Sequence, residues 1–176
     1  MILPSVTEVL QPWCTFNGIS REVLLQACIR GDAVHAYLSN IAEGLPVMAI
    51  PPEYEGYVQS GRLWLQEMVV EVEAVEERFV DPDFQFHGQP DLIAILKDKK
   101  RILGDWKTGA MPQKSWPLQM AGYELLADKR GIKIDRYGTV QLFATGKIGK
   151  FLDYSGDIRD RSLFLQAVNL WRYFHS

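Results

Sequence analysis

Two short segments carry acidic and basic side chains at a spacing that suits metal-ion chemistry. Asp91 follows Gly88 and Pro90 in one segment, and Asp105 and Lys107 stand two residues apart in the other. Residues two apart on a strand share a face, so Asp105 and Lys107 point the same way. If the segments pair as an antiparallel hairpin with its tip at residues 98–100, Asp91 lies close across from Lys107.

Placing two carboxylates and an ammonium this close together is unfavourable unless their charges are compensated. Two close carboxylates repel unless a cation neutralises them, and carboxylate oxygens are ligands that Mg²⁺ and Mn²⁺ prefer. Lys107 would then position a water molecule and stabilise charge building on a phosphate. The alternative is a simple salt bridge between Lys107 and Asp91 on an exposed sheet face.

Four motifs in order give the chain a resemblance to a known family. They are G-x-x-x-H at Gly31 to His35, a glycine three residues before Asp91, D-x-K-T at Asp105 to Thr108, and Q-x-x-x-Y at Gln119 to Tyr123. Together they resemble the PD-(D/E)xK nuclease superfamily, in its RecB/AddB/Cas4-like and phage exonuclease branch. The resemblance covers residues 31–123 and implies a restriction-endonuclease-like core and a metal-dependent deoxyribonuclease.

The resemblance also implies roles for individual residues. The metal ligands would be His35, Asp91, Asp105 and the backbone carbonyl of Trp106, with Mg²⁺ or Mn²⁺ as the cofactor. The catalytic residues would be Asp91, Asp105, Lys107, Gln119, Tyr123 and Glu77, with Glu76 as the alternative to Glu77. Gln119 and Tyr123 share one helical face, although a polar stripe on an amphipathic helix would look the same. An iron–sulfur cluster, which some relatives hold, is excluded because the only cysteines are Cys14 and Cys28.

Net charge changes along the chain in a way that suits a polyanionic partner. The formal charge is −3 overall, yet residues 66–91 carry eight acidic side chains and one basic, and residues 92–176 carry fifteen basic and eight acidic. An acidic block beside a basic half fits a cation site next to a DNA surface, or simply a solvated acidic strand followed by surface lysines. The predicted DNA-binding residues are Lys99, Lys100, Arg101, Lys114 and Trp116. Core packing is the alternative for the tryptophan.

Phosphate contacts by lysines carry no sequence information, so we expect low sequence specificity. The chain has no phosphate-binding G-x-x-x-x-G-K-[ST] sequence, so the expected substrate is DNA that is single-stranded or has free ends, with any helicase or recombinase supplied by another chain. The rival hypotheses are a non-catalytic DNA-binding or recombination accessory module that retains the nuclease fold, and a sequence-specific restriction enzyme, which the Gln119 and Tyr123 helix disfavours.

The elements that must position these residues follow from periodicity. The 176 residues are 47% hydrophobic and 23% charged, which fits one soluble globular domain. Helices are expected at residues 5–10, 20–30, 32–43, 54–65, 115–129 and 158–174, where the stretch 32–43 is either a separate helix or a continuation of the one before Gly31. Strands are expected at 68–80, 84–96, 101–107 and 137–145. This order predicts an α/β fold with a mixed sheet: a three-stranded antiparallel meander, a helix and a further strand. A helical part at 1–65, a catalytic core at 66–146 and a C-terminal helix at 147–176 would form a single domain. With no membrane-spanning or leader pattern, we expect a cytoplasmic protein.

Overall fold

The computed structural model describes residues 3–14 and 18–175 as an α/β fold built on a mixed five-stranded sheet. The main sheet has the order β1-β4-β5-β6-β7, in which β5 and β6 are parallel and the other neighbours are antiparallel. Its strands are β1 (Val69–Val75), β4 (Leu92–Leu96), β5 (Arg101–Lys107), β6 (Arg136–Gln141) and β7 (Lys150–Asp153). A second sheet pairs β2 (Phe79–Asp81) with β3 (Phe86–Gly88). The expected mixed sheet is confirmed.

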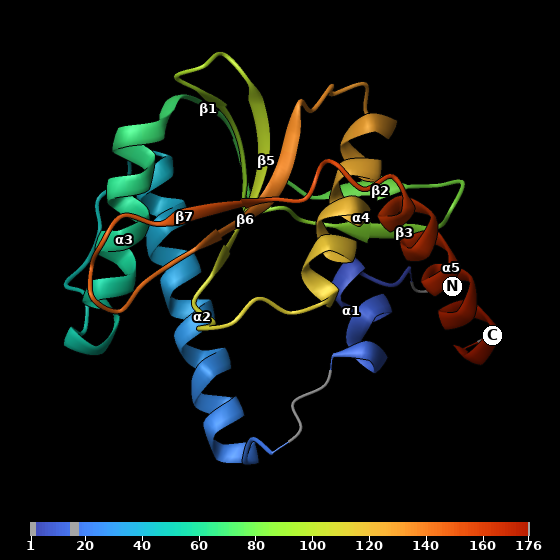
Figure 1. Ribbon diagram of the computed structural model, residues 1–176, viewed down its shortest axis with the longest axis horizontal. Coiled ribbons are helices and arrows are strands. Elements are labelled where there is room, and N and C mark those ends of the chain that lie inside the picture. The colour runs from blue at the N-terminus through green and yellow to red at the C-terminus, as the bar shows by residue number, and fades with distance from the viewer. Residues whose placement is uncertain (1–2, 15–17, 176) are drawn as a thin grey trace.

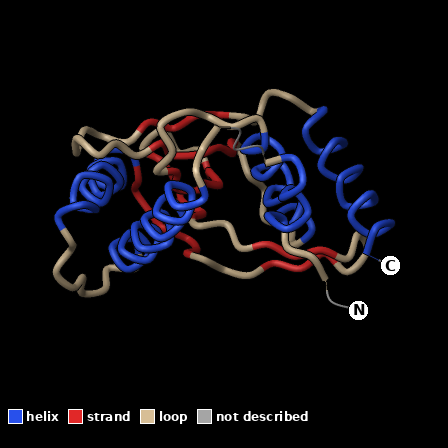
Figure 2. Tube along the Cα trace, turned by 90° about the horizontal axis from the view of Figure 1, so that it is seen from below, coloured by secondary structure: helices blue, strands red, loops and turns tan. Residues whose placement is uncertain are grey.

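Helices cover the two faces of the main sheet in two groups, as Figure 2 shows. On one side lie α2 (Arg21–Ala42) and α3 (Pro52–Met68); on the other lie α1 (Val6–Leu10), α4 (Ser115–Lys129) and α5 (Arg159–His175) (Figure 1). A 3-10 turn, η1 (Gln11–Trp13), follows α1. In the described part of the chain, no helix is long and apolar enough to cross a membrane.

Local sequence signals explain where the first helices begin. Ser5 caps α1 by accepting a hydrogen bond from the Glu8 amide at 3.1 Å, while the Glu8 carboxylate accepts from the Ser5 amide at 2.7 Å. Ser20 caps α2 by accepting from the Val23 amide at 3.3 Å. The helix then continues through Gly31, so the two predicted helical stretches are one element.

Three predicted strands were too long, including the one at 137–145, which ends at Gln141, and one strand was missed. Strand β1 ends at Val75 because Glu76 takes a left-handed conformation with φ 47°. The stretch predicted as one strand at 84–96 is divided between β3 and β4, because Pro90 has no amide to donate to a sheet. Strand β7, only four residues long, lies in the part predicted to hold the C-terminal helix alone.

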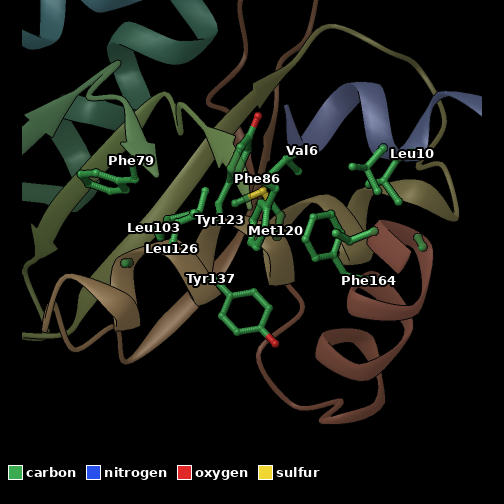
Figure 3. Packing of buried hydrophobic residues seen from close by; sticks show 14 of the residues in the cluster. Val6, Leu10, Phe79, Phe86, Leu103, Met120, Tyr123, Leu126, Tyr137 and Phe164 are labelled. Carbon is green, nitrogen blue, oxygen red and sulfur yellow. The ribbon is translucent and has the colours of Figure 1, made fainter. Parts of the chain in front are cut away.

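The hydrophobic core has two parts, one on each face of the sheet. Val34, Leu38 and Trp64 of α2 and α3 pack with Trp106 on one face. On the other face, residues of α1, α4 and α5 pack with the β2–β3 hairpin, including Phe86, Met120 and Phe164 (Figure 3). Each face of the sheet therefore packs against its own group of helices.

Candidate active site

The charged residues of the motifs meet where β4 begins and β5 ends. Asp91 directly precedes β4, Asp105 and Lys107 lie in the last part of β5, and Gln119 and Tyr123 lie on α4. His35 reaches this place from α2 on the opposite face of the sheet. Asp91, Asp105 and Gln119 are all buried, with 7%, 3% and 8% of their surfaces exposed. The four motifs therefore converge in space.

Asp91 joins α2 to the end of β5. Its carboxylate lies 3.1 Å from Nδ1 of His35 and accepts a hydrogen bond from the Trp106 amide at 2.7 Å. The register pairs Leu92 with Gly104, so Asp91 continues opposite Asp105 and not Lys107. The predicted register was wrong by two residues, because the turn is centred on Asp98, one residue earlier than assumed: the Leu96 amide donates to the Lys100 carbonyl at 2.9 Å.

Gln119 connects Asp105, Lys107 and Tyr123. Its amide nitrogen donates to Asp105 Oδ1 at 2.9 Å and lies 3.2 Å from the Tyr123 hydroxyl. Its amide oxygen accepts from Lys107 Nζ at 3.0 Å, and the same Nζ lies 2.6 Å from Asp105 Oδ2. The salt bridge of Lys107 is thus with Asp105, its neighbour on the same strand face, and a single amide orients both charged groups.

Burial and charge act against each other on the titratable groups of this network. Burial disfavours the imidazolium of His35, but the charge and hydrogen bond of Asp91 outweigh it and raise its pKa to about 9. Burial raises the pKa of Asp105, although the Lys107 ammonium opposes the change. Burial and the nearby carboxylates raise the pKa of the Tyr123 hydroxyl, so Tyr123 is neutral at physiological pH.

Close packing explains why a glycine stands at position 88 of the motif. A Cβ atom there would lie 2.8 Å from the Tyr123 ring and 2.8 Å from Leu126 Cδ1. Such distances are too short for any side chain. The absence of a side chain at Gly88 therefore lets α4 bring Tyr123 against the β2–β3 hairpin and toward Gln119.

The two glutamates at the end of β1 point to different places. Glu77 forms an ion pair with Arg130 at 3.1 Å near the end of α4, and both side chains are nearly half exposed. Glu76 accepts a hydrogen bond from the Ser39 hydroxyl at 2.6 Å, and Ser39 lies one helical turn after His35. The structure therefore brings Glu76, and not Glu77, next to the element that carries His35.

Three of the predicted DNA-binding residues lie away from the site. Lys99 and Lys100 lie at the β4–β5 turn, at the other end of the strands from Asp91 and Lys107, a separation of about 20 Å for seven residues. Arg101 forms a bidentate pair with Glu73 at 2.7 and 2.8 Å. Because antiparallel strands place their turn opposite their open end, this basic turn cannot contact the same phosphate as Lys107.

Trp116 and Lys114 are also placed differently from the expectation. Trp116 is 5% exposed, and Lys107 Nζ lies 5.8 Å from its ring centroid. The core-packing alternative therefore fits this tryptophan. Its ring also makes a cation–π contact with the Lys107 ammonium. Lys114 is exposed at the start of α4 and lines a cavity of about 490 Å³ that also contains Asp153, Asp157 and Asp160.

The donor groups fit a hard divalent cation. The carboxylates of Asp91 and Asp105 are suitable ligands for Mg²⁺ or Mn²⁺, whereas the imidazole of His35 is of the type that later transition metals prefer. Asp105 Oδ2 is buried without a hydrogen-bond partner, since the close Lys107 contact lacks hydrogen-bond geometry. Among residues 3–14 and 18–175, no three His, Cys, Asp or Glu side chains already form a metal site. His35 and Lys107 instead neutralise the two carboxylates. Trp106, whose backbone carbonyl was predicted as a metal ligand, contacts Asp91 through its backbone amide.

Sequence reasoning missed one residue that holds the segment after Lys107. Gln141 lies beside Lys107 on the parallel strand β6, and its amide nitrogen donates to the carbonyls of Gly109 and Ala110 at 3.2 and 2.9 Å. No local pattern identifies it, because a parallel register joins residues far apart in the sequence.

Comparison with protein-family models and with curated proteins finds no match for this chain. The function proposed below therefore follows from the residues of the site and their motif pattern.

Proposed function

We propose that this protein is a Mg²⁺- or Mn²⁺-dependent deoxyribonuclease that hydrolyses phosphodiester bonds with low sequence specificity. The observation that carries the proposal is the buried network in which Gln119 orients both Asp105 and Lys107. Such a network is expensive to build for structure alone, because each buried charge loses its hydration. The antiparallel β1-β4-β5 meander, followed by α4 and the parallel strand β6, supports a restriction-endonuclease-like core.

Each residue has a chemical task in this proposal. Asp91, Asp105 and His35 would hold the cation, which supplies charge stabilisation at the phosphoryl oxygens. Lys107 would orient the attacking water and stabilise the negative charge that develops during hydrolysis. Gln119 would keep Lys107 in place, and Tyr123 would limit the rotation of Gln119 through its hydroxyl.

The proposed substrate is DNA that is single-stranded or has free ends. The site is recessed, with only 17% of the Lys107 side chain exposed. A strand end enters a recessed site more easily than the middle of a stiff duplex does. A helicase or recombinase in another chain would provide such ends, and the cytoplasm is the proposed location.

The alternative is a non-catalytic DNA-binding or recombination accessory module. The observation that favours it is the pairing of His35 with Asp91 and of Lys107 with Asp105, which balances charge without a metal. The two proposals differ in one measurable property, since only the first requires cleavage that depends on a divalent cation.

Cleavage assays with matched variants test the proposal. The protein is incubated with end-labelled single-stranded and double-stranded linear DNA and with circular DNA, in Mg²⁺, in Mn²⁺ and in EDTA. Asp105→Asn and Lys107→Ala should each lower the rate by roughly 100-fold or more. Lys97→Ala is the control, because Lys97 is 57% exposed and lies 3.9 Å from Glu67.

The outcomes separate the hypotheses. Metal-dependent cleavage that Lys107→Ala abolishes and Lys97→Ala preserves supports the nuclease. Binding of DNA without cleavage under every condition supports the accessory module. Cleavage by folded Lys107→Ala at near the parent rate refutes the assigned roles, and cleavage of circles at fixed sequences supports a restriction enzyme.

A further inference from the structure

We infer that Ser39 and Glu76 form a clamp that positions His35 against Asp91, a role that rests on the proposed metal site. The clamp is defined as the hydrogen bond between the Ser39 hydroxyl and the Glu76 carboxylate, 2.6 Å long. It joins α2 to the end of β1 by a polar contact, beside the apolar contacts through which Val34 and Leu38 of α2 pack on this face of the sheet. Neither residue belongs to the four motifs.

The clamp acts on both members of the His35–Asp91 pair. On one side, Ser39 lies four residues after His35, and its hydroxyl is 3.0 Å from the His35 carbonyl. On the other side, the Glu76 amide donates to the Asp91 carbonyl at 3.2 Å. Glu76 therefore contacts the backbone of Asp91 and, through Ser39, the helical turn that carries His35.

The backbone at Glu76 is strained in a way that fits this role. Its φ of 47° lies in the left-handed region, which is unfavourable for a residue with a side chain. Strain of this kind persists where the surroundings hold the residue in place, and it is found most often at functional sites. Here the strained turn aims the carboxylate at α2, whereas Glu77, the next residue, turns to Arg130.

The consequence concerns metal affinity more than the chemical step. Ser39 is buried at 9% exposure, so its hydroxyl has few alternative partners. Without the clamp, α2 keeps its apolar packing but loses this polar link to the end of β1, and the imidazole is held less firmly relative to the Asp91 carboxylate. Residues that orient a metal ligand without touching the metal change the metal affinity by about 10–100-fold when they are removed.

Four variants of the whole protein test the clamp with two readouts. Ser39→Ala and Glu76→Ala remove it. Ser39→Thr keeps the hydroxyl, and Glu76→Gln keeps an oxygen that accepts from it. Glu67→Ala is the control for loss of one negative charge from the acidic region. The first readout is Mn²⁺ affinity by electron paramagnetic resonance, and the second is the NMR signal of the His35 ring in the metal-free protein, assigned by its absence in His35→Asn.

We expect Ser39→Ala and Glu76→Ala to weaken Mn²⁺ binding by about tenfold or more and to broaden the His35 ring signal. Ser39→Thr, Glu76→Gln and Glu67→Ala should stay close to the parent. Parent-like values for Ser39→Ala in both readouts would overturn the clamp. So would equal losses in Glu76→Gln and Glu76→Ala, since charge and not the hydrogen bond would then matter. If the parent neither binds Mn²⁺ nor cuts DNA, the proposed function fails, and the His35 signal alone decides on the clamp.

Discussion

The His35–Asp91 pair predicts that the metal-free protein loses stability as the pH rises. Asp91 raises the pKa of His35 from an ordinary 6.5 to about 9, against the opposing effect of burial. A group whose pKa is higher in the folded protein stabilises the fold fully below its unfolded pKa. That contribution is therefore complete below pH 6.5 and is lost as the pH passes through 9.

The size of the effect follows from the same values. A difference of one pH unit in pKa corresponds to about 1.4 kcal/mol, so the full pair would contribute roughly 3 kcal/mol. The His35 side chain is 27% exposed, and solvent screening reduces this amount. We expect about 1–2 kcal/mol, which corresponds to roughly 3–6 °C in melting temperature for a chain of this size.

The assay compares the parent with His35→Asn in EDTA at pH 6 and at pH 10. Other groups titrate over this range in both proteins, so the difference between the two proteins isolates the pair. The parent should exceed the variant in unfolding free energy by about 1–2 kcal/mol more at pH 6 than at pH 10. A difference between parent and variant that is the same at both pH values would refute the reasoning.

Two further predictions concern the support of the site by α4. Gly88→Ala should lower the unfolding free energy by about 1–3 kcal/mol, because its Cβ would collide with the Tyr123 ring, whereas Gly156→Ala, with open space around it, should leave the melting temperature unchanged. Equal melting temperatures for the two glycine variants would contradict this packing argument. Gln119→Leu should leave Asp105 Oδ1 and the Lys107 ammonium without their amide partner, lowering the cleavage rate by about 10–100-fold at saturating metal. A cleavage rate equal to that of the parent would show that Gln119 does not position Lys107.

Elements with strong local signals could be predicted from the sequence. The bounds of β5 and α4 agree with the prediction at both ends, since Thr108 and Gly109 end the strand and Gly131 closes the helix. The cap at Ser5 is equally local. Short strands carry weaker signals, which explains why β7 was missed and why the β2–β3 hairpin was merged into its neighbours.

The site was predictable in its members and less so in its contacts. Motif order identified His35, Asp91, Asp105, Lys107, Gln119 and Tyr123, which the structure brings together. The partner of each charge depends on register, and a shift of two residues moved Asp91 from Lys107 to the Trp106 amide. Ser39 and Gln141 act through contacts between distant segments, which a single sequence does not reveal.

The position of the site explains why its parts come from the whole fold. His35 stands on α2, which packs on one face of the sheet through Val34 and Leu38. Tyr123 stands on α4, which packs on the other face through Met120 and Leu126. The distance between His35 and the Gln119 network is therefore set by both halves of the core and by the sheet between them. A core change such as Leu38→Ala, which removes only apolar contacts, should disturb the imidazole and broaden the NMR signal of the His35 ring, because α2 reaches Asp91 only when it is docked on its own face.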